Sequence, residues 1–416
     1  MKFLTVSLGC KVNSYENASL REIFISKGYI PSKSKPDIVV INTCSVTSIA
    51  DQKSRQIIRR YRKRFPNAIL VTMGCFSQKN ALVAKNCGSD IVVGTTSRNK
   101  IPQYIETFIS NKKPIIDINE DVRHLTYESF GSFALPDSTR AYIKIEDGCN
   151  NFCTYCTIPY TRGKARSRDK DEIISEIKFL ISKGYKEFVL TGIHTAHYGV
   201  DLKGITFSDL VEEILNIAGL YRLRISSIEE SEIDDKLISL FEKYDNLASH
   251  LHMPLQSGSS TTLKAMGRKY NVDDYIKKVE RIRKVRPDIA ITTDVIVGFP
   301  NESEEDFLDT FNFIKKVNFS ELHVFPFSAR EGTKAYLMDN QVDSETKSNR
   351  VSRLIKLSDE LNEKYRQKFI GQELEVILEE RNRFTNKLSG FTSNYLKLSV
   401  DLPDEYIGKI VKIKVE

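Results

Sequence analysis

The stretch EDGCNNFCTYCTIPY, residues 146–160, places three cysteines, Cys149, Cys153 and Cys156, within eight residues. Such a short loop can bring three sulfurs to one point, because an extended chain spans only about 3.3–3.6 Å per residue. A closed structural zinc site needs four ligands, whereas three thiolates on a four-iron cluster leave one iron open to another ligand. The spacing therefore favours a [4Fe–4S] cluster. A zinc site completed by a distant residue, and three buried cysteines, are the alternatives.

The cysteine loop follows the first of six strand–helix units expected between residues 138 and 368. Repeated units of this kind are typical of a parallel barrel, in which the chemistry lies at the carboxyl ends of the strands. The sequence therefore predicts a central, partial (β/α)6 barrel with the cysteine loop at its catalytic end. The expected strands are AYIKIED, EFVLTGI, RLRISSI, ASHLHMPL, AITTDVIVGF and SELHVFPFS.

Apolar strands also alternate with helices in residues 1–110, which predicts an α/β domain with a mainly parallel sheet. The expected strands are KFLTVSL, PDIVVINTC, AILVTMGC and DIVVGTT, with helices near Glu16–Lys27 and Ala50–Arg64. Cys10, Cys44 and Cys75 each come just after one of these strands. Strand ends of a parallel sheet meet at one edge, so three distant cysteines can form one site there.

Two further segments complete the α/β chain. Residues 111–137 have no clear period and are interpreted as a linker. After an expected helix over Ser344–Phe369, residues 369–416 alternate apolar and polar side chains, which predicts a small antiparallel β domain. Its expected strands are QELEVILEE, NYLKLSV and KIVKIKVE.

Composition limits the class of protein. The chain has 416 residues, a formal net charge of +7 and seven cysteines. No apolar run reaches the roughly 20 residues that span a bilayer, and the apolar run at the N-terminus is shorter than a signal peptide uses. A cytoplasmic protein is therefore expected, and in that reducing compartment metal or redox chemistry is favoured over disulfides. The mild positive charge is compatible with a nucleic-acid partner.

The spacing C-x3-C-x2-C, with the aromatic Tyr155 before the third cysteine, resembles the signature of radical S-adenosylmethionine (SAM) enzymes. The resemblance implies that the open iron binds the methionyl amino and carboxylate groups of SAM. Electron transfer to SAM then releases a 5′-deoxyadenosyl radical. It follows from the resemblance that SAM takes the place of the missing fourth ligand.

The stretches SLGCKVNSYEN, VINTCSVT and TMGC resemble the three N-terminal cysteine motifs of the methylthiotransferases. The resemblance implies a second [4Fe–4S] cluster on Cys10, Cys44 and Cys75. Within that family, SLGCKVN, GCNNFCTYCTIPYTRGKARSR and TGIHTAHYG are most similar to the bacterial enzymes that methylthiolate N6-threonylcarbamoyladenosine at position 37 of tRNA. Relatives acting on isopentenyladenosine, or on an aspartate of ribosomal protein S12, usually carry a different residue set around the first cysteine.

This resemblance implies partners and alternatives. The C-terminal domain is similar to the TRAM domain, an OB-like RNA-binding module, and the substrate would be the anticodon loop of tRNA at adenosine 37. A reduced flavodoxin- or ferredoxin-type electron donor and a sulfur source would also be needed. The nearest alternative is the isopentenyladenosine enzyme. A noncatalytic RNA-binding protein with structural zinc sites is the alternative from another class.

The SAM pocket is expected in the loops at the strand ends. Tyr155 is placed near the adenine and Glu229 near the ribose, with structural packing as the alternative for each position. His194, His197 and His252 lie in the same loops with no role decided by the sequence, and Cys87 is interpreted as a buried residue. The SAM-binding candidates are Tyr155, Thr191, Gly192, Glu229, Gln256 and Ile296.

Two basic stretches are candidates for RNA contact. The expected helix over Arg55–Arg64 is strongly positive, so its residues face either solvent or phosphates. TRGKARSR, beside the cysteine loop, is expected to anchor the RNA backbone so that a splayed-out adenine reaches the chemistry. Its candidate RNA-binding residues are Arg162, Lys164, Arg166 and Arg168.

Overall fold

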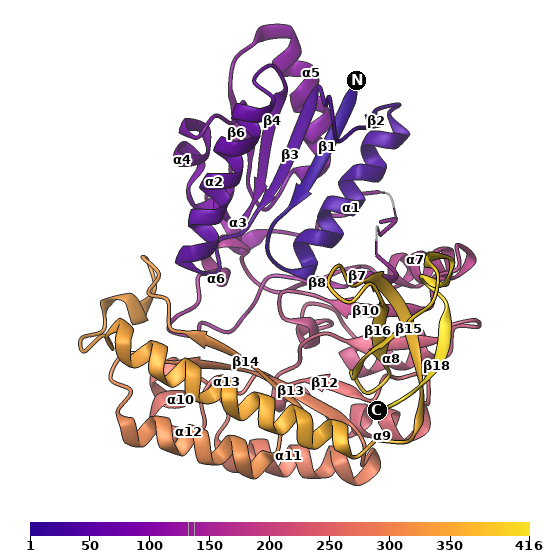
Figure 1. Ribbon diagram of the computed structural model, residues 1–416. Helices are drawn as coiled ribbons and strands as arrows, with labels where there is room; N and C mark the ends of the chain where they lie inside the picture. The colour runs from indigo at the N-terminus through magenta and orange to yellow at the C-terminus, as the bar shows by residue number, and fades with distance from the viewer. Residues whose placement is uncertain (132, 137) are drawn as a thin grey trace.

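A computed structural model describes residues 1–131, 133–136 and 138–416. Three parts follow one another along the chain: an N-terminal α/β domain, a central barrel, and a C-terminal sheet docked against the side of the barrel (Figure 1). No helix in the described part of the chain is long and apolar enough to cross a membrane. The α/β class and the order of the three parts agree with the prediction from sequence.

The N-terminal domain is built on one parallel sheet in the order β2-β1-β3-β4-β5-β6. Its strands are β1 (Lys2–Ser7), β2 (Ile30–Pro31), β3 (Ile38–Thr43), β4 (Ile69–Gly74), β5 (Ile91–Val93) and β6 (Ile115–Asp117). Both faces of β3 are buried, because Ile38 and Val40 pack toward one helical layer while Val39 and Ile41 pack toward the other. Burial on both faces explains the continuous apolar runs in these strands.

Helices cover both faces of this sheet. The first layer contains α1 (Lys11–Ser26) and α5 (Ile101–Asn111), and the second contains α2 (Ser48–Arg64), α3 (Cys75–Lys79) and α4 (Ala81–Asn86). Helix α1 begins at Lys11 rather than near Glu16, because its first turn is polar and is held by tertiary contacts of the buried Asn13. Strand β6 pairs with β5, so the sheet extends beyond residue 110 into the segment interpreted as a linker.

The central part is a partial barrel of six parallel strands, as the sequence predicts. Two three-stranded sheets, β11-β10-β7 and β12-β13-β14, are joined by a parallel bridge between Leu223 and Leu247. A two-stranded pair, β8 (Glu146–Asp147) and β9 (Arg166–Ser167), brackets the cysteine loop. The barrel strands are β7 (Arg140–Lys144), β10 (Glu187–Thr191), β11 (Arg222–Ile225), β12 (His250–His252), β13 (Ala290–Val297) and β14 (Glu321–Pro326).

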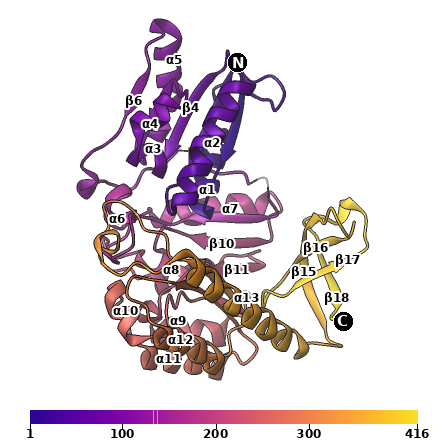
Figure 2. The same ribbon diagram turned by 60° about the vertical axis from the view of Figure 1, so that its left-hand side comes forward.

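Helices line the outside of the barrel, and α13 runs along its open edge before the chain enters the C-terminal sheet (Figure 2). Each helix buries one apolar stripe in a single large core shared with the strands. The helices are α7 (Lys170–Ser182), α8 (Phe207–Leu215), α9 (Asp235–Lys243), α10 (Ser260–Met266), α11 (Val272–Val285), α12 (Glu304–Val317) and α13 (Ser344–Gln367), with the short α6 (Ile158–Thr161) after the cysteine loop.

The C-terminal part is an antiparallel sheet in the order β17-β16-β15-β18. The strands are β15 (Glu373–Arg381), β16 (Leu388–Thr392), β17 (Lys397–Val400) and β18 (Ile410–Lys414). Strand β16 was not predicted, because its sequence LSGFT contains a glycine that weakens the strand pattern. The structure explains that glycine: a Cβ on Gly390 would lie 1.9 Å from the carbonyl oxygen of Ile377.

Buried arginines attach the C-terminal sheet to the barrel. Arg224 donates from Nη2 to the carbonyl oxygen of Thr392 at 3.0 Å, and from Nη1 to that of Ser393 at 3.2 Å. Glu187 lies between Arg222 and Arg224 at 3.0 and 2.9 Å and balances their charge. These contacts fix the end of β16 and the residue after it against strands β10 and β11 of the barrel.

A buried network of five charged side chains joins the N-terminal domain to the barrel. Glu16 and Arg98 come from the N-terminal domain, and Lys144, Asp147 and Arg162 come from the barrel; each is at most 1% exposed. Lys144 lies 2.9 Å from Glu16 and 2.7 Å from Asp147, and Arg162 lies 2.9 Å from both carboxylates. Arg98 also pairs with Glu16. Because charges are costly to bury unpaired, this network specifies one relative placement of the two domains.

Replacing Glu16 with Gln should therefore destabilise the protein strongly. Lys144 and Arg162 would then both depend on Asp147, which also pairs with Arg166. Removing one partner from a buried ion pair costs about 3–5 kcal/mol. Glu106→Gln on the exposed face of α5 is the control and should stay within about 0.5 kcal/mol of the parent. The measurement is the free energy of unfolding in urea followed by tyrosine fluorescence. Equal stability of the two variants would contradict the role assigned to Glu16.

The stability of the parent and that of the Glu16→Gln variant should depend differently on pH. Burial raises the pKa of Glu16, but Arg162, Arg98 and Lys144 together lower it below its usual value. A lowered pKa stabilises the folded chain above the unfolded-state pKa of about 4.3, and this stabilisation is lost as the pH falls further. The stability difference between the parent and Glu16→Gln should therefore shrink below about pH 4.

Candidate active site

The loop between β8 and α6 carries Cys149, Cys153 and Cys156. The backbone N–H groups of Asn151 and Ile158 donate to the sulfurs of Cys149 and Cys156 at 3.3 and 3.4 Å. Arg268 donates from Nη1 to the sulfur of Cys153 at 3.3 Å. Each sulfur thus has a donor that stabilises a thiolate, the form in which cysteine binds metal.

Without a metal the loop thiols are poor thiolates. Burial raises the pKa of Cys149 far above the usual range and that of Cys156 to about 12. In the described part of the chain, neither triad has all three of its sulfurs within 4.8 Å of one another. A tetrahedral zinc ion with Zn–S bonds of about 2.3 Å would hold its sulfurs only about 3.8 Å apart. The wider spacing fits a multinuclear cluster better than a single zinc ion.

The second triad lies at the carboxyl edge of the N-terminal sheet. Cys10 caps the start of α1, Cys44 follows β3, and Cys75 begins α3 directly after β4. A Cβ on Gly9 would lie 2.7 Å from the Cys44 sulfur, which shows how closely this turn packs on that thiol. Burial raises the pKa of Cys44 to about 11, and the neighbouring thiols of Cys75 and Cys10 add to the increase. The structure therefore brings the three predicted residues together.

Arg162 connects the two triads across the domain interface. It directly follows α6, next to the first cysteine loop, and its Nε donates to the sulfur of Cys75 at 3.2 Å. The Cys75 thiol is also close enough to Cys156 to contribute to the rise in the pKa of Cys156. Two cysteine triads from different domains thus face each other across one buried arginine.

A cavity of about 210 Å3 opens beside the first triad. Of the predicted SAM contacts, Tyr155, Glu229 and Gln256 line this cavity. Glu229 accepts from Asn151 at 3.2 Å and pairs with Arg268 at 2.8 Å. The cavity therefore offers charged groups of both signs beside the cysteine sulfurs, as binding of a zwitterionic amino-acid group requires.

The other three predicted SAM contacts lie elsewhere. Thr191 and Gly192 line a neighbouring cavity, and Ile296 packs in the apolar cluster that contains Tyr155. A Cβ on Gly192 would lie 2.8 Å from Oε2 of Glu146, so the glycine allows close packing there. The roles of these residues toward SAM stay predictions.

The sequence did not decide the role of His194, which contacts the cysteine loop in the structure. His194 places Nδ1 at 3.4 Å from the Cys149 sulfur and Nε2 at 2.7 Å from Glu232. His197 stacks on the His194 ring at 3.7 Å and pairs with Glu232 at 3.0 Å. Burial raises the pKa of Glu232, but hydrogen bonds with the two histidines lower it to about 2. The carboxylate therefore orients His194 toward the first cysteine.

Sequence reasoning also missed Arg268. It lies in the turn after α10, distant in sequence from the cysteine loop, and no motif marks it. Only the tertiary structure reveals its contacts with Cys153 and Glu229.

The larger neighbouring cavity, of about 520 Å3, is formed by all three parts of the chain. The N-terminal domain contributes Gly9 to Val12, the barrel contributes strand ends, and the C-terminal sheet contributes Tyr395. Ser227 and Asp294 line this cavity and the smaller one, so the two adjoin. Lys11 lies at the edge of this cavity. Loss of water around its ammonium group, and to a lesser extent repulsion from Arg140 and Arg224, lowers the pKa of Lys11 to about 8.

The prediction that the basic loop anchors RNA is wrong for its three arginines. Arg162, Arg166 and Arg168 are at most 5% exposed, and only Lys164 is exposed. Arg168 pairs with the buried Glu176, and Arg166 donates to the carbonyl oxygen of Lys164 at 2.9 Å. A local run of basic residues does not reveal distant carboxylates and carbonyls, so sequence alone could not separate buried arginines from exposed ones.

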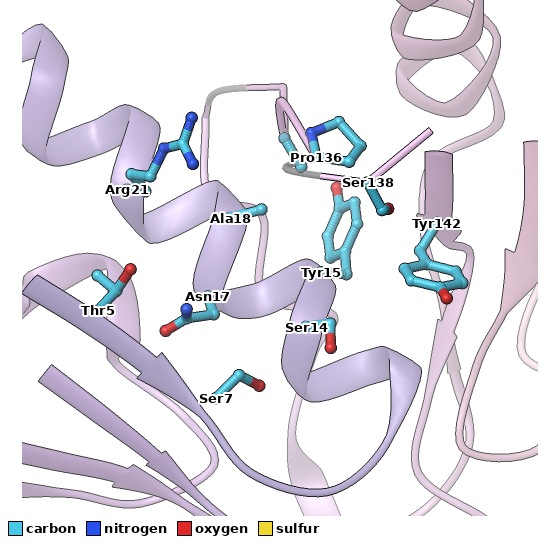
Figure 3. Close-up of a pocket in the computed structure, with 11 residues that line it drawn as sticks. Thr5, Ser7, Ser14, Tyr15, Asn17, Ala18, Arg21, Pro136, Ser138 and Tyr142 are labelled. Carbon is cyan, nitrogen blue, oxygen red and sulfur yellow. The ribbon is translucent and has the colours of Figure 1, made fainter. Parts of the chain in front are cut away.

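Another pocket, of about 310 Å3, lies between α1 and the segment that leads into β7 (Figure 3). Tyr15 and Tyr142 extend into it from opposite sides, as the close-up shows. None of the cysteines or predicted SAM contacts lines it. The pocket is therefore separate from the two cavities at the cysteine triads.

Two family models match the chain. A model of the radical SAM superfamily matches residues 143–314, which contain the first cysteine loop. A model of the uncharacterized protein family UPF0004 matches residues 2–94, which contain the second triad. Each matched range therefore contains one of the two cysteine triads.

Curated relatives match nearly the full length. The threonylcarbamoyladenosine tRNA methylthiotransferase MtaB of Bacillus subtilis (strain 168) is 45% identical, covering 98% of this chain and 92% of the relative. The protein of the same name from Aquifex aeolicus is 37% identical, with 100% of each chain covered. A tRNA-2-methylthio-N(6)-dimethylallyladenosine synthase of Caldicellulosiruptor saccharolyticus is 36% identical over 99% of this chain and 89% of its own.

Solved structures with a similar fold include two radical SAM proteins. The methyltransferase TsrM of Kitasatospora setae has a TM-score of 0.58 at 14% identity and covers 78% of this chain and 72% of TsrM. The cobalamin-dependent enzyme OxsB has a TM-score of 0.53 at 11% identity and covers 87% of this chain and 61% of OxsB. At these identities the likeness concerns the fold.

Cys44→Ala should halve the iron content. If each triad holds a four-iron cluster, the parent binds about eight irons per chain and the variant about four. Cys87→Ala is the matched control, because Cys87 is also buried in the N-terminal domain but packs in its apolar core. Iron and acid-labile sulfide are measured after anaerobic reconstitution. Zinc without sulfide in the parent, or unchanged iron in Cys44→Ala, would contradict this assignment.

Proposed function

Because the chain belongs to the tRNA methylthiotransferase family, we propose that it inserts sulfur and a methyl group at C2 of N6-threonylcarbamoyladenosine at position 37 of tRNA. The observation that carries the proposal is the pair of cysteine triads facing each other across the domain interface, with a cavity beside them. Replacing an unactivated C–H bond with a C–S bond needs both a radical source and a nearby sulfur donor. One cysteine triad is proposed to hold the radical source, and the other is proposed to hold the sulfur donor.

Each triad has a distinct part in the proposal. When bound, a four-iron cluster on Cys149, Cys153 and Cys156 supplies the electron that cleaves SAM, and a second cluster in the N-terminal domain presents the sulfur. The backbone N–H groups of Asn151 and Ile158 orient two of the loop sulfurs. Glu229 and Arg268 provide opposite charges for the polar groups of SAM in the smaller cavity.

The larger cavity is the proposed site of the target base. Bases in a loop are recognised after they leave the stack and pack against aromatic side chains. Phe325 lines this cavity and is 46% exposed, which leaves its ring free to stack on an adenine. Tyr395 lines the cavity too, but it is already stacked on His250 at 4.1 Å. Phe325 is therefore the proposed stacking partner, with Tyr395 as the supporting wall.

Contacts with the rest of the tRNA are assigned to two surfaces. The outer face of α2 exposes Arg59, Arg60, Lys63 and Arg64, and it replaces the buried loop arginines as the proposed phosphate contact. The C-terminal sheet is proposed to act as the TRAM-like RNA-binding part. The proposal also includes a cytoplasmic location, a reduced flavodoxin- or ferredoxin-type electron donor and a sulfur source.

The proposed function is tested with tRNA that carries defined nucleosides. The anaerobically reconstituted protein is incubated with SAM, a reductant and either threonylcarbamoyladenosine- or isopentenyladenosine-containing tRNA, followed by nucleoside mass spectrometry. We expect the 2-methylthio product with the first tRNA. Product with only the second tRNA would assign the isopentenyladenosine activity instead. No product with either tRNA, together with bound zinc, would favour the noncatalytic alternative.

The two triads should be separable in one reaction. Cys149→Ala should stop 5′-deoxyadenosine formation, because this residue belongs to the set beside the SAM cavity. Cys44→Ala should block the methylthio product but leave deoxyadenosine measurable, because it lies in the other domain. Both products are quantified from the same mixture.

Both variants must remain folded for this comparison, so the control is that each variant still binds the cluster of its unaltered triad. Normal methylthio product from Cys44→Ala, or SAM cleavage by Cys149→Ala, would contradict the division between the triads.

A further inference from the structure

The larger cavity contains a cation without a partner. Lys11, the first residue of α1, lines this cavity, and its side chain is exposed there. No residue in the described part of the chain forms a hydrogen bond or ion pair with its ammonium group. An ammonium group held in a protein cavity gains most from an anionic ligand.

The other charged groups that line this cavity already have partners. Arg140 pairs with Glu379 at 2.7 Å, and Arg224 pairs with Glu187 at 2.9 Å. Both arginines line the same cavity as Lys11 and contribute positive potential there.

The anionic group of the cavity is engaged as well. Asp294 lies 3.3 Å from His252 and 3.2 Å from His323. Its hydrogen-bonding partners are the two histidines, although its charge also acts on Lys11. Among the described residues that line the cavity, Lys11 is the cation without a hydrogen bond or ion pair, and two further positive charges lie nearby.

We propose that Lys11 binds the carboxylate of the threonyl group on the substrate nucleoside and so selects this N6 substituent. The inference rests on the proposed function and deepens it. Threonine linked through its amine keeps a free carboxylate, which is ionised at neutral pH. The opposite charges of this group and Lys11 form a charge-assisted hydrogen bond.

The same residue disfavours an apolar substituent. A dimethylallyl group is a hydrocarbon and cannot accept a hydrogen bond. If it filled the cavity, it would remove water from the Lys11 ammonium without replacing the lost interaction, which is unfavourable. Lys11 thus supplies both an attraction for the acidic nucleoside and a penalty for the apolar one, the two elements on which specificity rests.

The experiment tests whether Lys11 recognises the carboxylate of the threonyl group. Two anticodon stem–loop RNAs carry N6-threonylcarbamoyladenosine or its threoninol analogue, in which a CH2OH group replaces the carboxylate. Their dissociation constants and kcat/KM values are measured with the reconstituted parent, Lys11→Met and Lys11→Arg. Lys27→Met, at the exposed far end of α1, is the matched control.

The parent and Lys27→Met should prefer the acid over the alcohol by about 10- to 100-fold, the range expected for a charged hydrogen bond. Lys11→Met should reduce this preference to less than about threefold, while Lys11→Arg should retain most of it. Because Lys11 adjoins Cys10, iron content and RNA-independent deoxyadenosine formation are measured in every variant. Both should match the parent.

Three results would overturn the inference. First, Lys11→Met could keep the full preference for the acid. Secondly, it could weaken the binding of both RNAs equally, which would assign Lys11 to an RNA phosphate. Thirdly, Lys11→Arg could lose the preference while retaining both clusters. Failure of the proposed function is a different result: the parent would bind the acidic RNA without forming methylthio product, and the binding preference would still test Lys11.

Discussion

The buried network of Glu16, Arg98, Lys144, Asp147 and Arg162 is the interaction on which the rest of the structure depends. Two carboxylates and three cations are withdrawn from water, and Glu16 meets Lys144 and Arg162 only when the N-terminal domain sits on the barrel in one orientation. Apolar surfaces tolerate sliding, whereas a buried charge displaced from its partner is strongly unfavourable. The network therefore makes the domain interface specific as well as stable.

The specificity of this interface has a chemical consequence, because Arg162 also donates to the sulfur of Cys75. Arg162 thus touches one cysteine triad and directly follows the helix after the other. Sulfur transfer between a site in one domain and a radical formed at the other requires a small and constant separation. A rigid, charge-specified interface meets that requirement better than a mobile one.

The larger cavity depends on a second docking contact. Arg222 and Arg224 hold the C-terminal sheet through carbonyl oxygens at the end of β16, and Tyr395 from the following turn stacks on His250 of the barrel. The cavity consequently has walls from all three parts of the chain and exists only when they are assembled. Lys11, which has no hydrogen bond or ion pair within the described part of the chain, comes from the same turn as Cys10, so the proposed substrate selection and the proposed cluster ligand share one short segment.

The sequence by itself determined the cysteine triads, the parallel sheet, the six barrel strands and the resemblance to a family. These depend on local spacing and on periodic burial, which a chain displays without folding. It did not reveal β16, the contacts of Arg268, or the burial of Arg162, Arg166 and Arg168. Only the tertiary structure decided them, because the charge of a side chain is local, whereas its burial and its partner depend on residues far away in the chain.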